Sequence, residues 1–488
     1  MLRRLLALAF LALCSRAQAP GQDPTAVLMG RLTGPSSLLE ANLRVLTDEI
    51  GGRVTGSAGY ESALRWGVEA FRRAGVDSVA LETYPVPAKW EAVSATAEVV
   101  EPSRFPVRIV SYGLAPSTNG EETAPVVDAG AGLPADFERL GAKSRGAIVL
   151  VRTEPMKSFD DLFAEYLAAP GVMHAAIAHG AAAILFLSTR PRGLLYRHTI
   201  TWGPIAPIPM AQIRREDGLR LARLLDAGRP LRLKLDIQNR VGGPWQPSNV
   251  VAEIRGSEHP EEIVLLGAHL DSWDLGTGAL DNGVNCALVV DVARAIAEGP
   301  RPKRTIRFVL FTSEETGLLG SLGYVRSHRA ELSLHVAVVI HDIGDGKIVG
   351  YYSNGRPDLE APLRAILSPL APLSASGING EALLGTDNFD FLLEGVPNLV
   401  ADQQADRYLA DYHAESDTFD KVDLELARRN AAVAAVAVLG IADAPARLGP
   451  RQTRAEVARV LEEGRLDAQM KTYGLWSDWE SGKRGRER

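Results

Sequence analysis

The stretch EEIVLLGAHLDSWDLGTGALDNG, residues 261–283, determines the expected fold. It opens with a near-continuous apolar run, which is typical of a strand buried on both faces of a sheet. Similar runs follow, and helix-like spacing of apolar residues separates them. This alternation predicts an α/β fold with a mixed, largely parallel sheet sandwiched by helices. The other strands are expected within 305–315, 335–344 and 397–403, and the helices at 284–298, 317–328, 358–370 and 423–443.

Changes of composition along the chain indicate its domain organisation. Residues 20–112 combine helix-like and strand-like patterns and are expected to be the N-terminal part of the same α/β domain. Residues 113–246 are rich in Gly, Ala and Pro, with short apolar runs, and predict an inserted β-rich module. Residues 247–445 complete the α/β domain. Residues 446–488 are expected to form a C-terminal helix and a tail whose charged end, SGKRGRER, is disordered.

Residues 1–19 have the layout of a secretory signal peptide. Arg3 and Arg4 precede an apolar run at 5–13, and small residues suited to cleavage follow. The run is too short to span a bilayer, and we expect no transmembrane segment elsewhere. These features predict a secreted or periplasmic protein, with lipid anchoring at Cys14 as the alternative.

The composition excludes several classes of protein. The 488 residues are 46% hydrophobic and 23% charged, as in globular proteins, and not as in disordered or collagen-like chains. The formal net charge of -7 argues against a protein that binds nucleic acid by neutralising phosphates. There is no GxSxG and no HExxH, so the usual signatures of serine hydrolases and single-zinc proteases are missing.

Acids and histidines gather where the expected strands end. In open α/β sheets ligands bind at these carboxyl ends, so the repeated pattern indicates a site. Histidines and carboxylates without cysteine are ligands for zinc or a similar ion in hydrolytic sites. So many carboxylates would repel one another unless two divalent cations held them together. The residues concerned are His269, Asp271, Asp274, Asp281, Glu314, Glu315, His341, Asp342 and His413.

Strand geometry divides the roles of neighbouring residues. Adjacent side chains face opposite sides of a strand, so His341 and Asp342 are not expected to bind the same ion. Of Glu314 and Glu315, one is expected to bind metal and the other to act as general base. Asp271 is placed to accept a hydrogen bond from the His269 imidazole.

Five separated motifs together resemble the zinc peptidases of the M28 family, most closely its plasma glutamate carboxypeptidase branch. The opening helices, around IGGRVTGSAGYESALRW at 50–66, are also similar to that family. Within the expected module, GAIVLVR, HGAAAILFL and PIPMAQI resemble a protease-associated domain. The five motifs are HLDSWDLGTGALDNG (269–283), TSEETGLLGS (312–321), the strand-end Asp342, GTDNFDFLLEGVP (385–397) and YHAESDTFD (412–420).

The resemblance implies two Zn²⁺ per chain and a role for each residue. His269 and Asp342 would complete one zinc site, Glu315 and His413 the other, and Asp281 would bridge both. Glu314 would be the general base. The peptide bond between Asp281 and Asn282 would be cis, although Asn282 and Val284 stand where this branch often has Asp and Gly.

On the substrate side the resemblance implies roles for Thr386, Asp387 and Phe389, although a helix-capping turn explains the first two equally well. The resulting hypothesis is an exported di-zinc exopeptidase that hydrolyses small peptides or dipeptides, as an aminopeptidase or a dipeptidase. A homodimer is implied by the resemblance. The alternatives are a single-zinc acyltransferase similar to glutaminyl cyclase and a non-catalytic ectodomain similar to the transferrin receptor.

Overall fold

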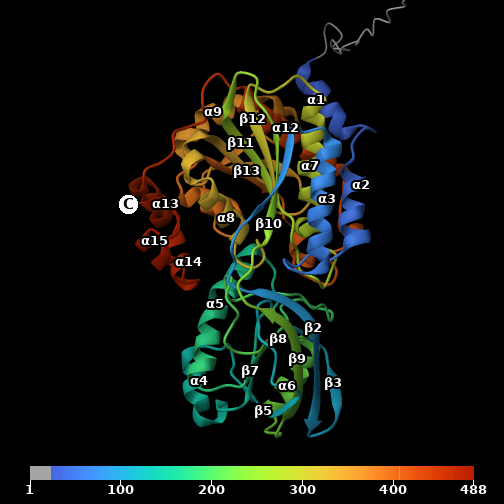
Figure 1. Cartoon of the computed structure of the whole chain (residues 1–488). Coiled ribbons are helices and arrows are strands. Elements are labelled where there is room, and N and C mark those ends of the chain that lie inside the picture. Colours follow the sequence, from blue (N-terminus) through green and yellow to red (C-terminus); the bar gives the residue numbers. More distant parts are fainter. Residues whose placement is uncertain (1–22, 406, 488) are drawn as a thin grey trace, which may run out of the picture.

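The computed structural model describes residues 23–405 and 407–487, which form two lobes, one above the other in Figure 1. Within this described part, each lobe is built on its own eight-stranded sheet. The expected signal peptide at 1–19 lies outside the described residues. Among the described residues, no helix has the length and apolarity needed to cross a membrane.

The upper sheet is the expected α/β sheet, and its strand order is β1-β10-β12-β11-β13-β16-β14-β15. The four apolar runs form its parallel centre, because β11 pairs in parallel with both β12 and β13, and β13 with β16. Antiparallel pairs, β10 with β12 and β14 with β16, flank this centre. The strands are β1 (Ser78–Thr83), β10 (Ser248–Ile254), β11 (His259–His269), β12 (Arg304–Phe311), β13 (His335–Ile340), β14 (Ile348–Tyr352), β15 (Gly377–Asn379) and β16 (Asn398–Gln403).

Both faces of this sheet are covered, as its near-continuous apolar strands require. In β11, Val264 and Leu266 belong to the cluster that packs under α1, α2, α3, α7 and α12, whereas Leu265 belongs to the cluster under α8 and α10. Figure 1 shows the two groups of helices on opposite sides of the sheet. The α-helices of the upper lobe that precede the C-terminal tail are α1 (Pro24–Thr33), α2 (Leu39–Arg44), α3 (Ala58–Ala74), α7 (Val284–Ala297), α8 (Leu319–Ser327), α9 (Glu360–Leu367), α10 (Asn388–Leu393), α11 (Tyr408–Asp411) and α12 (Leu424–Asp443).

The lower lobe is an insertion between two neighbouring strands of the upper sheet. Thr83, the last residue of β1, is the cross-strand partner of Ser248, the first residue of β10. The chain therefore leaves the upper sheet and returns to it at one point. The second sheet has the order β3-β2-β9-β5-β6-β7-β8-β4. Its strands are β2 (Lys89–Glu101), β3 (Phe105–Val107), β4 (Ile109–Ser111), β5 (Glu122–Asp128), β6 (Ile148–Val151), β7 (Ala183–Leu187), β8 (Met210–Ile213) and β9 (Arg232–Gly242).

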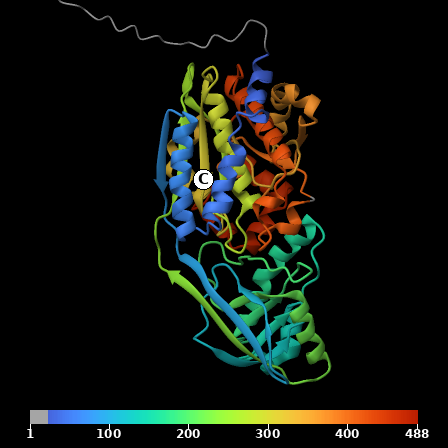
Figure 2. The same ribbon diagram turned by 90° about the vertical axis from the view of Figure 1, so that its right-hand side faces the viewer.

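The insert is larger than the expected range of 113–246, because β2, β3 and β4 belong to the lower sheet. The physical reason is the pairing of β2 with β9 from Lys89 to Glu101, which Figure 2 shows as two long neighbouring strands. Alternating apolar residues identify a strand but do not identify its sheet. Three helices complete the lobe: α4 (Pro134–Leu140), α5 (Phe159–Ala178) and α6 (Arg215–Asp226).

The C-terminal tail forms three helices, α13 (Arg454–Glu463), α14 (Leu466–Thr472) and α15 (Trp476–Ser481), and docks on the upper lobe. Trp479 is buried in a cluster with Phe389 of α10. The expectation of a disordered end is wrong for Arg484, whose guanidinium forms two hydrogen bonds, of 2.9 and 2.8 Å, with the buried carboxylate of Asp390. A buried ion pair fixes this part of the tail.

Candidate metal centre

The strand-end residues meet at the carboxyl edge of the upper sheet, next to the insert. His269 is the last residue of β11, and Glu314 and Glu315 follow β12. Asp342 follows β13, and His413 lies on the connection after β16. The parallel centre of the sheet therefore brings four segments, far apart in sequence, to one edge.

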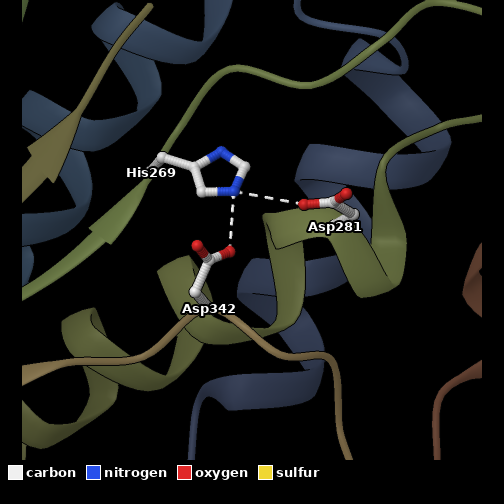
Figure 3. A group of neighbouring side chains, drawn as sticks. All are labelled: His269, Asp281 and Asp342. Carbon is white, nitrogen blue, oxygen red and sulfur yellow. Dashed lines mark hydrogen bonds and ion pairs between the residues drawn. The ribbon is translucent and has the colours of Figure 1, made fainter. Parts of the chain in front are cut away.

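Two groups of three ligand atoms form at this edge. In the first, shown in Figure 3, His269 Nε2 lies 2.9 Å from Asp342 Oδ1 and 3.1 Å from Asp281 Oδ1. In the second, His413 Nε2 lies 2.9 Å from Glu315 Oε2 and 3.2 Å from Asp281 Oδ2. Asp281 thus gives one carboxylate oxygen to each group. We call them the first and second half-sites.

These atoms fit divalent ions. Two atoms that bind one zinc at about 2.0–2.1 Å lie roughly 3.0–3.4 Å apart, close to the spacing within each half-site. Each half-site has three buried ligands, from histidine and carboxylate side chains. The second oxygen of Glu315, Oε1, is also buried and has no hydrogen-bond partner in the described part of the chain. The donor set and its spacing fit zinc.

Burial and neighbouring charges shift the pKa values of the side chains in both half-sites. Burial raises the pKa of Glu315 to about 7, and the charge of Asp281 adds to the rise. Burial alone would lower the pKa of His413, but Glu315 and Asp281 raise it to about 9. Hydrogen bonds to His269 and His413 lower the pKa of Asp281 although burial opposes this. The carboxylates and imidazoles of the two half-sites therefore interact electrostatically, and a bound cation would favour the charged form of each carboxylate.

Arg53 shapes the loop between His269 and Asp281. Its fully buried guanidinium donates to the carbonyls of Leu270 (2.8 Å), Thr277 (2.7 Å) and Gly278 (2.8 Å). The loop also depends on Gly278, whose φ is 59° and where a Cβ would lie 2.3 Å from the Cβ of Ser272. Sequence reasoning missed the role of Arg53, because bonds to backbone carbonyls leave no motif at the accepting residues.

Asp417 was missed as well, and it positions Asp281, whose carboxylate is shared by the two half-sites. Its carboxylate accepts from the backbone N–H groups of Leu280 (2.7 Å) and Asp281 (3.1 Å). Burial raises the pKa of Asp417 to about 7. The motif YHAESDTFD contains Asp417, but its spacing alone did not separate this residue from surface acids.

The expected cis peptide bond between Asp281 and Asn282 is present. The Asn282 side chain donates to the backbone carbonyl of His341 (3.0 Å) and accepts from Asn285 (2.7 Å). Asn282 is therefore bonded next to Asp342 and is no ligand in either half-site. His341 is not a member of either half-site.

Asp271 differs from expectation in its partner. The Nδ1 of His269 bonds to the backbone carbonyl of Asp271 (2.9 Å), and its distance to the carboxylate is 3.9 Å. The carboxylate instead accepts from the backbone N–H of Glu314 (3.2 Å). The Asp271 side chain points toward the backbone of Glu314, the expected general base, and therefore does not accept a hydrogen bond from the His269 imidazole. Burial raises the pKa of Glu314 well above its ordinary value.

The expected substrate residues divide into two kinds. Asp387 occupies the N-cap position of α10, but its side chain makes no capping hydrogen bond. Burial raises the pKa of Asp387 to about 8. The charge of His269 opposes this rise and the charge of Asp342 adds to it, so the Asp387 carboxylate interacts electrostatically with the first half-site. Thr386 is buried beside it. Phe389 is fully buried in the cluster with the tail helices, so its ring packs in the core and does not line a substrate surface.

Comparisons with known proteins agree with this geometry. The family described as Peptidase family M28 matches residues 249–438. Carboxypeptidase Q from Xenopus laevis is 30% identical over 389 residues, which are 78% of this chain and 81% of that protein.

Solved structures show the same architecture. The crystal structure of a Peptidase M28 precursor from Shewanella amazonensis SB2B has a TM-score of 0.78 and 29% identity, and covers 88% of this chain and 98% of that one. BSAP, a zinc aminopeptidase from Bacillus subtilis, has a TM-score of 0.66 and 20% identity, covers 82% of this chain and 93% of that one, and supports the fold. These matches show that the chain belongs to peptidase family M28.

Proposed function

We propose that this metallo-exopeptidase uses two zinc ions to hydrolyse small peptides or dipeptides. The observation that carries the proposal is the division of the Asp281 carboxylate, with Oδ1 in the first half-site and Oδ2 in the second. A carboxylate shared in this way suits two neighbouring ions. A single ion would contact the three ligand atoms of one half-site and leave those of the other without a cation.

Zinc ions bound here would supply Lewis acidity, which polarises a peptide carbonyl and makes water nucleophilic near neutral pH. Glu314 is the general base in this proposal. It takes a proton from the attacking water and passes it to the nitrogen of the departing amine, so that water is added across the C–N bond. The hydrogen bond from its N–H to Asp271 positions its backbone.

The remaining parts of the proposal concern substrate and location. Thr386 and Asp387 are proposed to face the substrate, as the resemblance to the family implies. The insert is proposed to be a protease-associated domain on the strength of its sequence motifs. Export is proposed from the signal-like pattern at 1–19, with lipid anchoring at Cys14 as the alternative.

The test is metal content per chain, measured together with hydrolysis of a panel of dipeptides and longer peptides. The variant Glu314→Gln should keep two zinc ions and lose turnover by a factor of about 100 or more, because it removes the base and no ligand. The matched control is Glu360→Gln, an exposed residue of α9 that pairs with Arg364.

Other outcomes would refute the proposal in distinct ways. One zinc ion without hydrolysis would favour the acyltransferase reading, and no metal with no turnover would favour a binding ectodomain. Full activity in Glu314→Gln would leave the di-zinc site intact and assign the base elsewhere.

A further inference from the structure

A loop of the insert is hydrogen-bonded to the segment that carries the metal ligand His413. We call residues 188–199 the insert loop and residues 412–415 the ligand loop. Their backbones run antiparallel, and one isolated β-bridge joins the lower lobe to the upper lobe here. The contacts are the bridge between Tyr196 and Ala414, the bond from the Arg197 N–H to the His413 carbonyl (3.0 Å) and the bond from the Glu415 N–H to the Leu195 carbonyl (3.0 Å).

Side chains reinforce this pairing on both sides. Arg190, which is 2% exposed, donates to the Tyr412 carbonyl (3.3 Å), and its guanidinium lies over the Tyr196 ring. The hydroxyl groups of Tyr166 and Tyr412 are 2.7 Å apart. Arg197, 4% exposed at its side chain, bonds to Asp274 (2.6 Å) in the loop between the ligands His269 and Asp281. The contacts therefore converge on the ligand loop and its surroundings.

The ligand loop needs external support, because His413 has a φ of 58°. A residue other than glycine in this left-handed region is strained and stays there when its surroundings hold it. The element before it, α11, is a helix of four residues. The first half-site differs, since His269 ends a strand that is paired on both sides, with β12 and with β13.

The insert also covers the ring of His413. His198 is fully buried, with its ring centre 6.0 Å from that of His413, and Tyr412 stacks on the His413 ring at 3.7 Å. Neither nitrogen of His198, nor Nδ1 of His413, has a hydrogen-bond partner among the described residues. The outer nitrogen of a metal-binding imidazole normally has a partner that fixes the ring, and His198 is one of the polar groups that the insert brings close to His413.

We propose that the insert is part of the second half-site: it holds His413 in its ligating conformation, so that loosening the insert loop releases the second metal while the first stays bound. This inference rests on the two-metal site of the proposed function. It makes Arg190 and Arg197 positioning residues. The Arg190 side chain holds the ligand loop through the Tyr412 carbonyl, and the Arg197 side chain holds the insert loop in place against Asp274.

The test compares Arg190→Met and Arg197→Met with the control Arg152→Met. Arg152 pairs with Asp128 and Asp226 within the insert, so its loss leaves the contact with the ligand loop unchanged. Each variant is dialysed against chelators of increasing strength, and zinc per chain is measured together with the circular dichroism spectrum. The wild type and the control should keep two ions at a chelator strength at which Arg190→Met and Arg197→Met keep one. An affinity loss of about 10- to 100-fold for one ion is expected.

Second changes identify the ion that remains. In Arg190→Met, adding His413→Ala should not lower the zinc content further, whereas adding His269→Ala should remove the last ion. Arg197→Lys should recover part of the lost affinity, because it keeps a cation near Asp274. Variants that retain both ions with wild-type affinity, or lose both together, would overturn the inference. A wild type with a single ion would instead contradict the proposed function.

Discussion

Replacing Arg53 by methionine tests how much of the metal centre depends on one buried cation. The side chain is fully buried and donates four hydrogen bonds of 2.7–3.0 Å, to the carbonyls of Gly51, Leu270, Thr277 and Gly278. A buried carbonyl that loses its partner costs about 1–3 kcal/mol. The free energy of unfolding should therefore fall by about 4 kcal/mol or more in Arg53→Met. The loop that links His269 to Asp281 should also lose its fixed shape, and affinity for metal should fall.

The assay is equilibrium unfolding in urea, with and without zinc, followed by fluorescence and circular dichroism. The matched control is Arg65→Met, an exposed arginine of α3 whose guanidinium contacts Ser62. Its free energy of unfolding should change by less than about 0.5 kcal/mol. Arg53→Lys should lie between the two, because an ammonium keeps the charge but lacks the planar fork that reaches several carbonyls. A loss below about 1 kcal/mol in Arg53→Met would show that the carbonyls find other partners and would refute the reasoning.

Three further predictions concern separate parts of the molecule. Asp417→Asn should leave the fold intact but weaken zinc binding by about 10-fold in a chelator competition. The reason is that one amide oxygen replaces the two carboxylate oxygens that accept from the N–H groups of Leu280 and Asp281. Unchanged zinc affinity would contradict this role of Asp417. Burial lowers the pKa of His335 from 6.5 to about 4, so the unfolded chain takes up a proton first as the pH falls. This residue should contribute a loss of about 3 kcal/mol in the free energy of unfolding between pH 6.5 and pH 4, and in urea titrations the wild type should lose that much more stability than His335→Gln over this range. Arg484→Met leaves the buried carboxylate of Asp390 without its partner and should cost about 3–5 kcal/mol in the same assay, whereas the double variant with Asp390→Leu should recover most of that loss.

The central strands and the gathering of the ligand residues followed from the sequence for one physical reason. Strands buried on both faces must be apolar, and a parallel sheet places the ends of such runs at one edge. The runs at 261–269 and 305–311 form β11 and β12, so His269 and Glu315 lie at or just after strand ends, as the sequence indicated. The positions were readable because the pattern is local.

The supports of the site were not readable, since they join residues far apart. Arg53 bonds to carbonyls more than two hundred positions away, and any residue can supply a carbonyl. The extent of the insert was misjudged because β2 alternates like any half-buried strand, and its partner β9 lies at the other end of the insert in sequence. Arg484 belongs to a stretch whose charge predicted disorder, but Asp390 neutralises it in the core.

The adjacency of Thr83 and Ser248 has a consequence for the history and engineering of such chains. Cross-strand partners in an antiparallel pair lie about 5 Å apart, a gap that a two-residue turn can close. The lower lobe can therefore be gained, lost or exchanged in a single genetic step, without altering the register of the upper sheet. A minimal chain cut in this way would retain its sheet yet lack the loop beside His413. The upper lobe could then fold without the insert, but its metal centre would still depend on it. A transplanted lobe would need a loop that makes the same contact beside His413.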